Sequence, residues 1–312
     1  MTVPTTTLPT GAKLPLLGLG TWLSKPDEVK NAVREALDAG YRYIDTAFIY
    51  KNESEIGDVL QEYICSGKIK REELFITTKL FCSHNRPEEV EAEMRDSLGR
   101  LKLDYVDLYL IHGPVPFEHD MSAQLPDVRV EDTWRGMEGV FEKGLAKAIG
   151  VSNFSIEQVE RIQKVAKVPI HNIQVECHIY FPQFDLHDVC KKHNISFTAY
   201  APLGSPGRLQ QTAGKWELSP SPLEDDTVKS IAEKHGKTPA QVLIRHLIQR
   251  GLSVIPKSVN EKRIKENFDV LDFELNEEEI SKLNSAKHCQ RLFVGDLFKG
   301  HYEDPYKLER KQ

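Results

Sequence analysis

Four polar residues whose types suit proton transfer stand at or shortly after the ends of three consecutive apolar runs. They are Asp45, Tyr50, Lys79 and His112. The pKa of a free tyrosine, roughly 10, is too high for ready proton exchange near neutral pH, but a cation within ~4–6 Å lowers it. We therefore expect Lys79 to lower the pKa of Tyr50 while Asp45 holds Lys79 in place. Tyr50 would act as general acid to a carbonyl oxygen, and a neutral His112 would donate a second hydrogen bond to that oxygen.

This set of side chains polarises a C=O group but supplies no electrons, so the predicted chemistry requires an external hydride. A single such residue at a strand end is usually structural, whereas four suitable residues on three neighbouring strand ends are much less expected by chance. A metal-dependent barrel hydrolase or aldolase is a weaker alternative, with Asp45 and His112 as ligands. No HxH sequence follows a first strand and Lys79 would repel a metal ion, so we expect no metal site.

Eight short apolar runs predict the strands that would position these residues. They cover residues 16–19, 41–44, 74–78, 106–111, 147–151, 173–176, 196–200 and 253–255. Amphipathic stripes with helical spacing, such as that of residues 29–37, fill the intervals. The repeated strand–helix units predict an α/β fold, a single (β/α)8 TIM barrel domain over residues 1–312, with the active site at the C-terminal ends of the strands. A doubly wound dinucleotide-binding fold is the alternative, but Gly18-Leu19-Gly20 lacks the third glycine of its fingerprint.

Three further segments lie outside the repeated units. Residues 5–8 and 13–15 predict an N-terminal β-hairpin that plugs the N-terminal end of the barrel. The last interval is long, and its Gly-, Pro- and Ser-rich stretch at 204–222 and helix at 223–235 predict extra structure on the C-terminal face. The tail after His288 carries Phe293, Phe298, Tyr302 and Tyr306, so it either packs on the barrel or forms part of a pocket.

The composition excludes several other classes of protein. The 312 residues include 41 Lys and Arg and 47 Asp and Glu, a net charge of −6 that does not favour nucleic-acid binding. No apolar run approaches the ~18 residues of a membrane span, and the N-terminus does not resemble a secretory signal. The five cysteines are odd in number and form no CxxC pair, which predicts a cytoplasmic protein without disulfides. Of these, Cys82 could line a pocket, although an inert buried thiol is the more ordinary interpretation.

Three long segments resemble the aldo-keto reductase family, and the resemblance extends over nearly the whole chain. The segments are GYRYIDTAFIYKNESEIG at 40–57, MEGVFEKGLAKAIGVSNF at 137–154 and IPKSVNEKRIKENFDV at 255–270. The resemblance assigns the catalytic tetrad of the family to Asp45, Tyr50, Lys79 and His112. It also implies NADP(H) as cofactor, bound by Gly20, Thr21, Trp22, Ser152, Asn153, Gln174, Tyr200, Leu203, Ser205, Lys257, Ser258, Val259, Arg263, Glu266 and Asn267.

Within that set, the resemblance gives distinct parts of the cofactor to distinct residues. Ser152, Asn153 and Gln174 would hold the carboxamide, and Tyr200 would stack on the nicotinamide ring. Lys257 and Arg263 lie at the adenosine end, near the start of a helix, where two cations suit the 2′-phosphate of NADP. Two solvated surface charges are the alternative.

The predicted substrate pocket departs from the family pattern. Its residues are Trp22, Ile49, Phe81, Gly113 and Phe117. Many family members carry an aromatic residue, often Trp, where this chain has Gly113, and Trp is frequent where it has Phe81. We expect the missing side chain at Gly113 to leave open space near the reacting carbon and to admit bulky carbonyl compounds. A turn that only glycine can form is the alternative.

The resemblance implies an NADPH-dependent reductase of aldehydes and some ketones, acting on small-molecule carbonyl substrates as a monomer. The alternative is a cofactor-binding regulatory protein of the same fold with little turnover.

Overall fold

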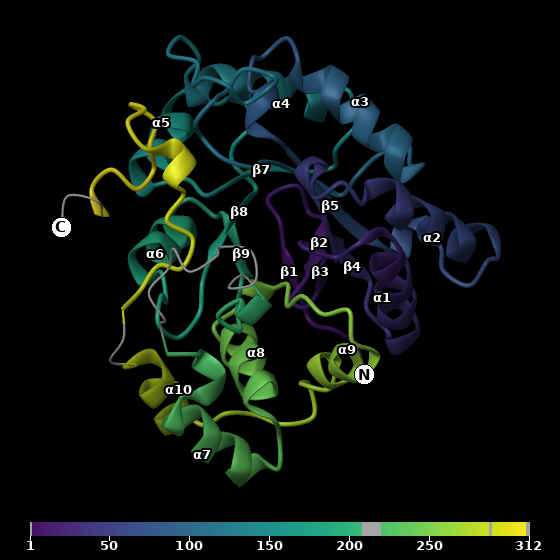
Figure 1. Ribbon diagram of the computed structural model, residues 1–312, viewed down its shortest axis with the longest axis vertical. Coiled ribbons are helices and arrows are strands. Elements are labelled where there is room, and N and C mark those ends of the chain that lie inside the picture. Colours follow the sequence, from purple (N-terminus) through teal and green to yellow (C-terminus); the bar gives the residue numbers. More distant parts are fainter. Residues whose placement is uncertain (1, 208–219, 287–288, 310–312) are drawn as a thin grey trace.

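The computed structural model describes residues 2–207, 220–286 and 289–309 (Figure 1). Within these residues, one parallel sheet has eight strands that follow each other in sequence order. The strands are β3 (Leu19–Gly20), β4 (Tyr43–Asp45), β5 (Phe75–Leu80), β6 (Leu108–Ile111), β7 (Ile149–Ser152), β8 (Asn172–Glu176), β9 (Ser196–Tyr200) and β10 (Ser253–Val254). This order confirms the eight predicted strands.

Backbone hydrogen bonds between the first and last strands close the sheet into a barrel. The Gly18 amide donates to the Val254 carbonyl at 2.8 Å, and the Val254 amide donates to the Leu16 carbonyl at 3.0 Å. A Cβ atom at Gly20 would lie only 2.7 Å from the carbonyl oxygen of Ile255, so glycine permits the close approach of the chains at this point. The (β/α)8 barrel expected from the sequence is therefore confirmed.

Some strand boundaries differ from the predicted ones, for local reasons. The apolar run at 41–44 begins inside a helix-ending turn, in which the Tyr41 amide donates to the Ala36 carbonyl at 2.9 Å and Gly40 has a φ of 110°. Strand β6 begins at Leu108 and not at residue 106. The amide of the intervening Asp107 donates to the Ile76 carbonyl at 3.0 Å, but the Ile76 amide donates to the Asp107 side chain at 2.8 Å and not to a backbone carbonyl.

Helices surround the strands in Figure 1. They are α1 (Pro26–Ala39), α2 (Glu53–Cys65), α3 (Val90–Leu101), α4 (Val130–Glu142), α5 (Ile156–Val165), α6 (Phe184–Lys192), α7 (Asp226–His235), α8 (Pro239–Gln249), α9 (Glu261–Phe268) and α10 (Glu277–Asn284). The predicted stripe of α1 is buried as expected, and α7 is the extra helix predicted in the last interval. None of the helices in these described ranges is long and apolar enough to span a bilayer.

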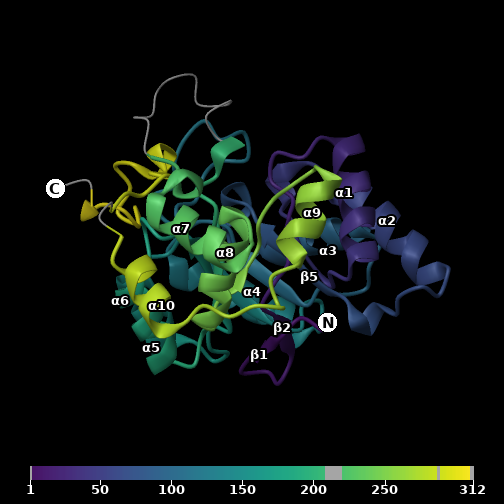
Figure 2. The same ribbon diagram turned by 90° about the horizontal axis from the view of Figure 1, so that it is seen from below.

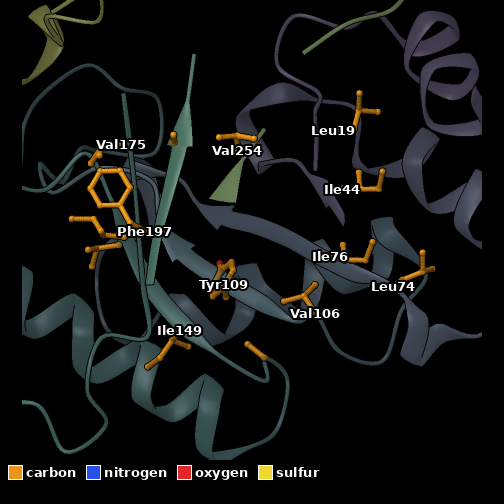
Figure 3. Close-up of a cluster of buried hydrophobic side chains, with 14 of the residues drawn as sticks. Leu19, Ile44, Leu74, Ile76, Val106, Tyr109, Ile149, Val175, Phe197 and Val254 are labelled. Atoms are coloured by element: carbon orange, nitrogen blue, oxygen red, sulfur yellow. The ribbon is translucent and has the colours of Figure 1, made fainter. Parts of the chain in front are cut away.

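The strands are buried on both faces. On the outer face, side chains such as Ile44, Ile76 and Tyr109 join residues of the surrounding helices in one large apolar cluster (Figure 3). At the N-terminal end of the barrel, Leu8 and Leu14 pack with residues from the beginnings of the strands. These two leucines belong to the hairpin of β1 (Thr5–Thr7) and β2 (Lys13–Pro15), which lies at the lower edge of Figure 2. The hairpin therefore covers that end of the barrel, as predicted, and leaves the opposite end for the site.

Candidate active site

The barrel brings the four predicted catalytic residues together at the C-terminal ends of neighbouring strands. Asp45 is the last residue of β4, Lys79 is the second-to-last residue of β5, and His112 follows β6 directly. Tyr50 ends a short 3-10 helix, Phe48–Tyr50, that follows β4. The rings of Tyr50 and His112 meet edge to face with 5.7 Å between their centroids. Proton-transfer groups from three strands therefore share one small volume.

A buried ion pair forms the floor of this arrangement. Lys79 Nζ donates to Asp45 Oδ1 at 2.6 Å and to the Thr46 carbonyl at 2.9 Å. Gln174 Nε2 donates to the other carboxylate oxygen of Asp45 at 2.7 Å. Burial raises the pKa of Asp45 and lowers that of Lys79, while the attraction between the two charges opposes both shifts. The pair is satisfied by hydrogen bonds on both sides, which a buried ion pair requires.

Tyr50 differs from the expectation drawn from the sequence. Lys79 Nζ lies 5.1 Å from the centre of the Tyr50 ring. Nevertheless the pKa of Tyr50 is raised well above its ordinary value, first by burial and then by the negative charge of Asp45. The expected lowering by Lys79 was wrong because Asp45 compensates the ammonium charge and burial dominates. The Tyr50 hydroxyl consequently keeps its proton at neutral pH and is a hydrogen-bond donor.

His112 is neutral, as expected. Burial lowers its pKa well below the ordinary value, and the positive charge of Lys79 adds to this effect. The backbone carbonyl of His112 accepts a hydrogen bond from Asn153 Nδ2 at 2.9 Å, which fixes the end of β6 against the end of β7.

The predicted carboxamide-holding residues lie beside this set. Asn153, with a left-handed φ of 62°, follows β7 and accepts a hydrogen bond on Oδ1 from the Tyr200 hydroxyl at 2.7 Å. Its Nδ2 also lies 3.2 Å from the Ser152 hydroxyl oxygen. Because Gln174 binds Asp45, the amide-rich wall and the Lys79–Asp45 pair are directly connected.

One cavity of about 1200 Å³ contains both groups of residues. Its lining includes every residue predicted to bind the cofactor: Gly20, Thr21, Trp22, Ser152, Asn153, Gln174, Tyr200, Leu203, Ser205, Lys257, Ser258, Val259, Arg263, Glu266 and Asn267. It also includes Asp45, Tyr50 and His112. The cavity is large enough to suit a dinucleotide together with a small substrate.

Two cations of this lining stand at the start of α9. Arg263 is in the first turn of the helix, where its amide donates to the side chain of the N-cap residue Asn260 at 3.0 Å. Burial lowers the pKa of Lys257, the negative charge of Glu28 opposes this shift, and the charge of Arg263 adds to it. Within the described residues neither cation forms an ion pair. Their charges and the helix N-terminus together favour an anion at this end of the cavity.

The structure places the five residues predicted for the substrate pocket in two different surroundings. Trp22, Ile49 and Phe81 line the cavity, but Gly113 and Phe117 are not among its lining residues. The open space expected beside Gly113 is filled, since a Cβ atom there would lie 2.7 Å from Cζ of Phe298. Phe117 is buried in a small cluster with Phe298 and its neighbours.

The sequence did not identify which residues of the tail reach the cavity. Phe293 contacts Trp22 and Tyr200, with ring centroids 5.6 Å and 5.3 Å apart. Leu297, Phe298 and Tyr306 also line the cavity. The aromatic content of the tail was the signal, and both predicted outcomes hold, because the tail packs on the barrel and forms part of the pocket.

Cys82 lines the cavity, and burial raises the pKa of its thiol to about 12, which agrees with the inert interpretation.

Glu176, at the end of β8, accepts hydrogen bonds from the amides of Leu292 and Phe293 at 2.6 Å and 2.9 Å. A lone acidic residue at a strand end gave no sequence signal for that role.

A barrel with this Asp, Tyr, Lys and His set at its C-terminal end defines a class of carbonyl-reducing oxidoreductases. The model of the aldo/keto reductase family matches residues 16–288 of this chain. The chain is 45% identical over 306 residues to aldo-keto reductase family 1 member A1-A of Danio rerio, covering 95% of this chain and 93% of the relative. It is 46% identical over 296 residues to member A1 of Gallus gallus, covering 91% and 89%.

A solved structure gives the same answer. The aldose reductase from Schistosoma japonicum superposes with a TM-score of 0.88 at 41% identity, covering 98% of this chain and 99% of the other. The chain therefore belongs to the aldo-keto reductase family, whose members use NAD(P)H, and it is an oxidoreductase acting on carbonyl compounds.

Proposed function

We propose that this protein catalyses the NADPH-dependent reduction of aldehydes and some ketones to alcohols, with Tyr50 as general acid. The observation that carries the proposal is the meeting of a protonated Tyr50 and a neutral His112 on one wall of the cavity, above the Lys79–Asp45 pair. Two hydrogen-bond donors converging on one point are the arrangement that a carbonyl oxygen requires as negative charge develops on it.

Tyr50 supplies the proton. Burial keeps its hydroxyl protonated until the carbonyl oxygen becomes basic enough to accept that proton. The phenolate left behind is stabilised by the Lys79 ammonium, 5.1 Å from the ring centre. Asp45, held by Gln174, keeps Lys79 charged and in place.

His112 orients the substrate. Its neutral ring donates one N–H to the carbonyl oxygen and does not compete with Tyr50 as an acid. The hydrogen bond from Asn153 to the His112 carbonyl fixes the backbone that carries this ring. The orientation of the carbonyl is therefore built into the strand ends.

The chemistry of the lining residues fits NADP(H), which supplies a hydride when bound. Ser152, Asn153 and Gln174 offer amide and hydroxyl groups to the carboxamide, and Tyr200 offers a ring for stacking. Lys257 and Arg263 would pair with the 2′-phosphate. The other proposed contacts are Gly20, Thr21, Trp22, Leu203, Ser205, Ser258, Val259, Glu266 and Asn267.

A turnover assay tests the proposal. The protein is mixed with excess NADPH and benzaldehyde, and NADPH oxidation is followed by absorbance. Many turnovers per protein molecule are expected. The alternative function, a cofactor-binding regulatory protein, predicts tight NADPH binding with at most one turnover, and that result across a panel of aldehydes and ketones would overturn the proposal.

We also infer a single domain over residues 1–312 that acts as a monomer in the cytoplasm. The hairpin of β1 and β2 and the C-terminal segment pack on opposite ends of the same barrel, which supports one cooperative unit. All five cysteines are free, which suits a reducing compartment. Analytical ultracentrifugation at micromolar concentration should give one species of monomer mass.

A further inference from the structure

Phe298 occupies the place that a side chain at position 113 would fill. A Cβ atom on Gly113 would lie 2.7 Å from Cζ and 3.3 Å from Cε1 of Phe298, and 3.1 Å from the Cys82 sulfur. Gly113 does not adopt the left-handed backbone conformation that favours glycine. A turn requirement therefore does not account for the glycine, whereas the close contact with Phe298 does.

The position of Phe298 is fixed by the segment that carries it. The ring is buried in a cluster with Cys82, Val115 and Phe117, and 6.3 Å separates its centroid from that of the Tyr306 ring. Gln124 Nε2 donates to the carbonyls of Leu297 and Lys299, at 2.8 Å and 3.3 Å. The Phe298 ring is consequently held against the chain that follows β6, although it comes from the C-terminal end of the sequence.

This ring continues an apolar wall around the substrate end of the cavity. Trp22, Ile49 and Phe81 come from the strand ends, and Phe293, Leu297 and Phe298 come from the C-terminal segment. Phe81 stacks edge to face on His112, with 6.0 Å between the ring centroids, so the wall begins beside the group that holds the carbonyl. Ile49 and Leu297, which are 38% and 48% exposed, extend it to the mouth.

We propose that Phe298, seated in the space left by Gly113, is the specificity-determining residue that makes this enzyme prefer aldehydes with an aromatic or extended apolar group over small hydroxylated aldehydes. The inference rests on the proposed function. An apolar group gains free energy by leaving water for this wall, whereas a hydroxylated chain would lose hydrogen bonds to water there. At the end of β6, where Gly113 supplies no side chain, the aromatic surface comes from the C-terminal segment.

The test compares kcat/KM for benzaldehyde and glyceraldehyde in the wild type and in Phe298→Ala. Loss of the ring should lower kcat/KM for benzaldehyde by roughly 10- to 200-fold, the usual effect of a lost apolar contact, and should change that for glyceraldehyde less than about threefold. Leu308→Ala is the matched control, because Leu308 lies in the same segment, is 66% exposed and does not line the cavity. The Leu308→Ala enzyme should have the wild-type kcat/KM for both aldehydes.

A second pair of variants tests the shared space. Gly113→Trp alone should lower the Tm and the activity on both aldehydes, because the new side chain meets the Phe298 ring. Combining it with Phe298→Ala should restore both the Tm and the preference for benzaldehyde, since the indole then forms the wall from the strand end. Phe298→Leu, which keeps apolar volume, gives a foldable variant with a smaller loss if Phe298→Ala is unstable.

The outcomes separate this inference from the function on which it rests. An equal fall for both aldehydes in a Phe298 variant with wild-type Tm would overturn the specificity role. A double variant that recovers neither Tm nor preference would overturn the shared space. If the wild type oxidises no NADPH with any aldehyde, the proposed function itself fails.

Discussion

Burial and a nearby positive charge act in opposite directions on Tyr50, the proposed acid. The acid must hold its proton before the reaction, and the base left behind must be stable enough to form. Burial raises the pKa of Tyr50 and so keeps the proton on the hydroxyl. The positive charge of Lys79, which Asp45 holds in place at 2.6 Å, favours the phenolate and offsets part of the cost of forming it in a buried site.

Replacing Tyr50 by phenylalanine removes the proton donor and leaves the ring in place. We expect kcat to fall by at least ~10²-fold, the scale of general acid catalysis. The NADPH dissociation constant, measured by the quenching of protein fluorescence, should stay within about twofold of wild type, because the residues proposed to bind the cofactor are untouched. A Tyr50→Phe enzyme with the wild-type rate on benzaldehyde would show that Tyr50 is not the acid.

At the other end of the cavity, Arg263 is proposed to recognise the 2′-phosphate. A charge-assisted hydrogen bond contributes about 1.5–3 kcal/mol, so Arg263→Ala should weaken NADPH binding by roughly 10- to 100-fold. NADH has no 2′-phosphate, and its dissociation constant should barely change. Titration calorimetry with both cofactors measures the difference.

Another cation of the same helix provides the control. Lys265 has a 51% exposed side chain that pairs with Glu35 and Glu261, and none of these three residues lines the cavity, so Lys265→Ala should leave both dissociation constants unchanged. An equal loss of NADPH and NADH affinity in Arg263→Ala would mean that Arg263 does not bind that phosphate.

At the scale of elements, the C-terminal segment of residues 289–309 depends on the end of one strand. Glu176, fully buried at the end of β8, accepts hydrogen bonds from two consecutive amides of the segment and contacts His178 Nε2 at 2.8 Å. Phe293, which carries the second of these amides, meets Trp22 and Tyr200 edge to face. One carboxylate therefore positions an aromatic wall of the cavity.

Glu176→Gln should loosen this segment, because an amide has one acceptor oxygen where the carboxylate uses two. Hydrogen bonds to a charged group contribute about 1.5–3 kcal/mol, so amide exchange in residues 289–309 should accelerate by roughly 10- to 100-fold. Mass spectrometry of peptic peptides measures this rate. Glu277→Gln, an exposed change at the start of α10, is the control. Unchanged exchange in Glu176→Gln would show that other contacts hold the segment.

The elements also show why the sequence predicted some features and not others. Strands, the stripe of α1 and the positions of Asp45, Lys79 and His112 follow from periodicity and from the rule that barrel sites gather at strand ends. The pairing of Gly113 with Phe298 and of Glu176 with the tail joins residues far apart in the chain, and such contacts depend on packing that no local pattern encodes. The direction of the Tyr50 pKa shift could not be predicted for a related reason, because it depends on how deeply the ring is buried.

At the scale of the whole molecule, buried neutral histidines make the fold sensitive to acid. Burial lowers the pKa of His171 and of His246 to about 4. His171 Nδ1 accepts a hydrogen bond from the Ile149 amide at 3.0 Å, so protonation would also remove that acceptor. Both side chains are buried, with exposed fractions of 2% for His171 and 0% for His246. Each must charge when the protein unfolds in acid.

The sign of the pH dependence follows from proton binding. Above pH ~6.5, the ordinary pKa of histidine, both histidines are neutral in the folded and unfolded states and stability does not depend on them. Between pH ~6.5 and the folded pKa of about 4, only the unfolded state binds the proton, so the free energy of unfolding falls as the pH falls. One pKa unit corresponds to about 1.4 kcal/mol, so each histidine can account for a loss of about 3 kcal/mol by pH 4.

Urea unfolding at pH 7, 6 and 5 measures this slope, and His246→Gln should reduce it. The glutamine cannot take up a proton. Its Nε2 can still donate to Asn284 Oδ1, which in the wild type lies 2.8 Å from His246 Nε2. The variant should therefore lose less stability than the wild type between pH 7 and pH 5, even if packing changes lower its stability at pH 7. Val165→Ala, at a 62% exposed side chain with no titratable group, should keep the wild-type slope. If His246→Gln and the wild type show the same slope, His246 is not among the groups that couple folding to pH, and the acid sensitivity must come from the buried carboxylates instead.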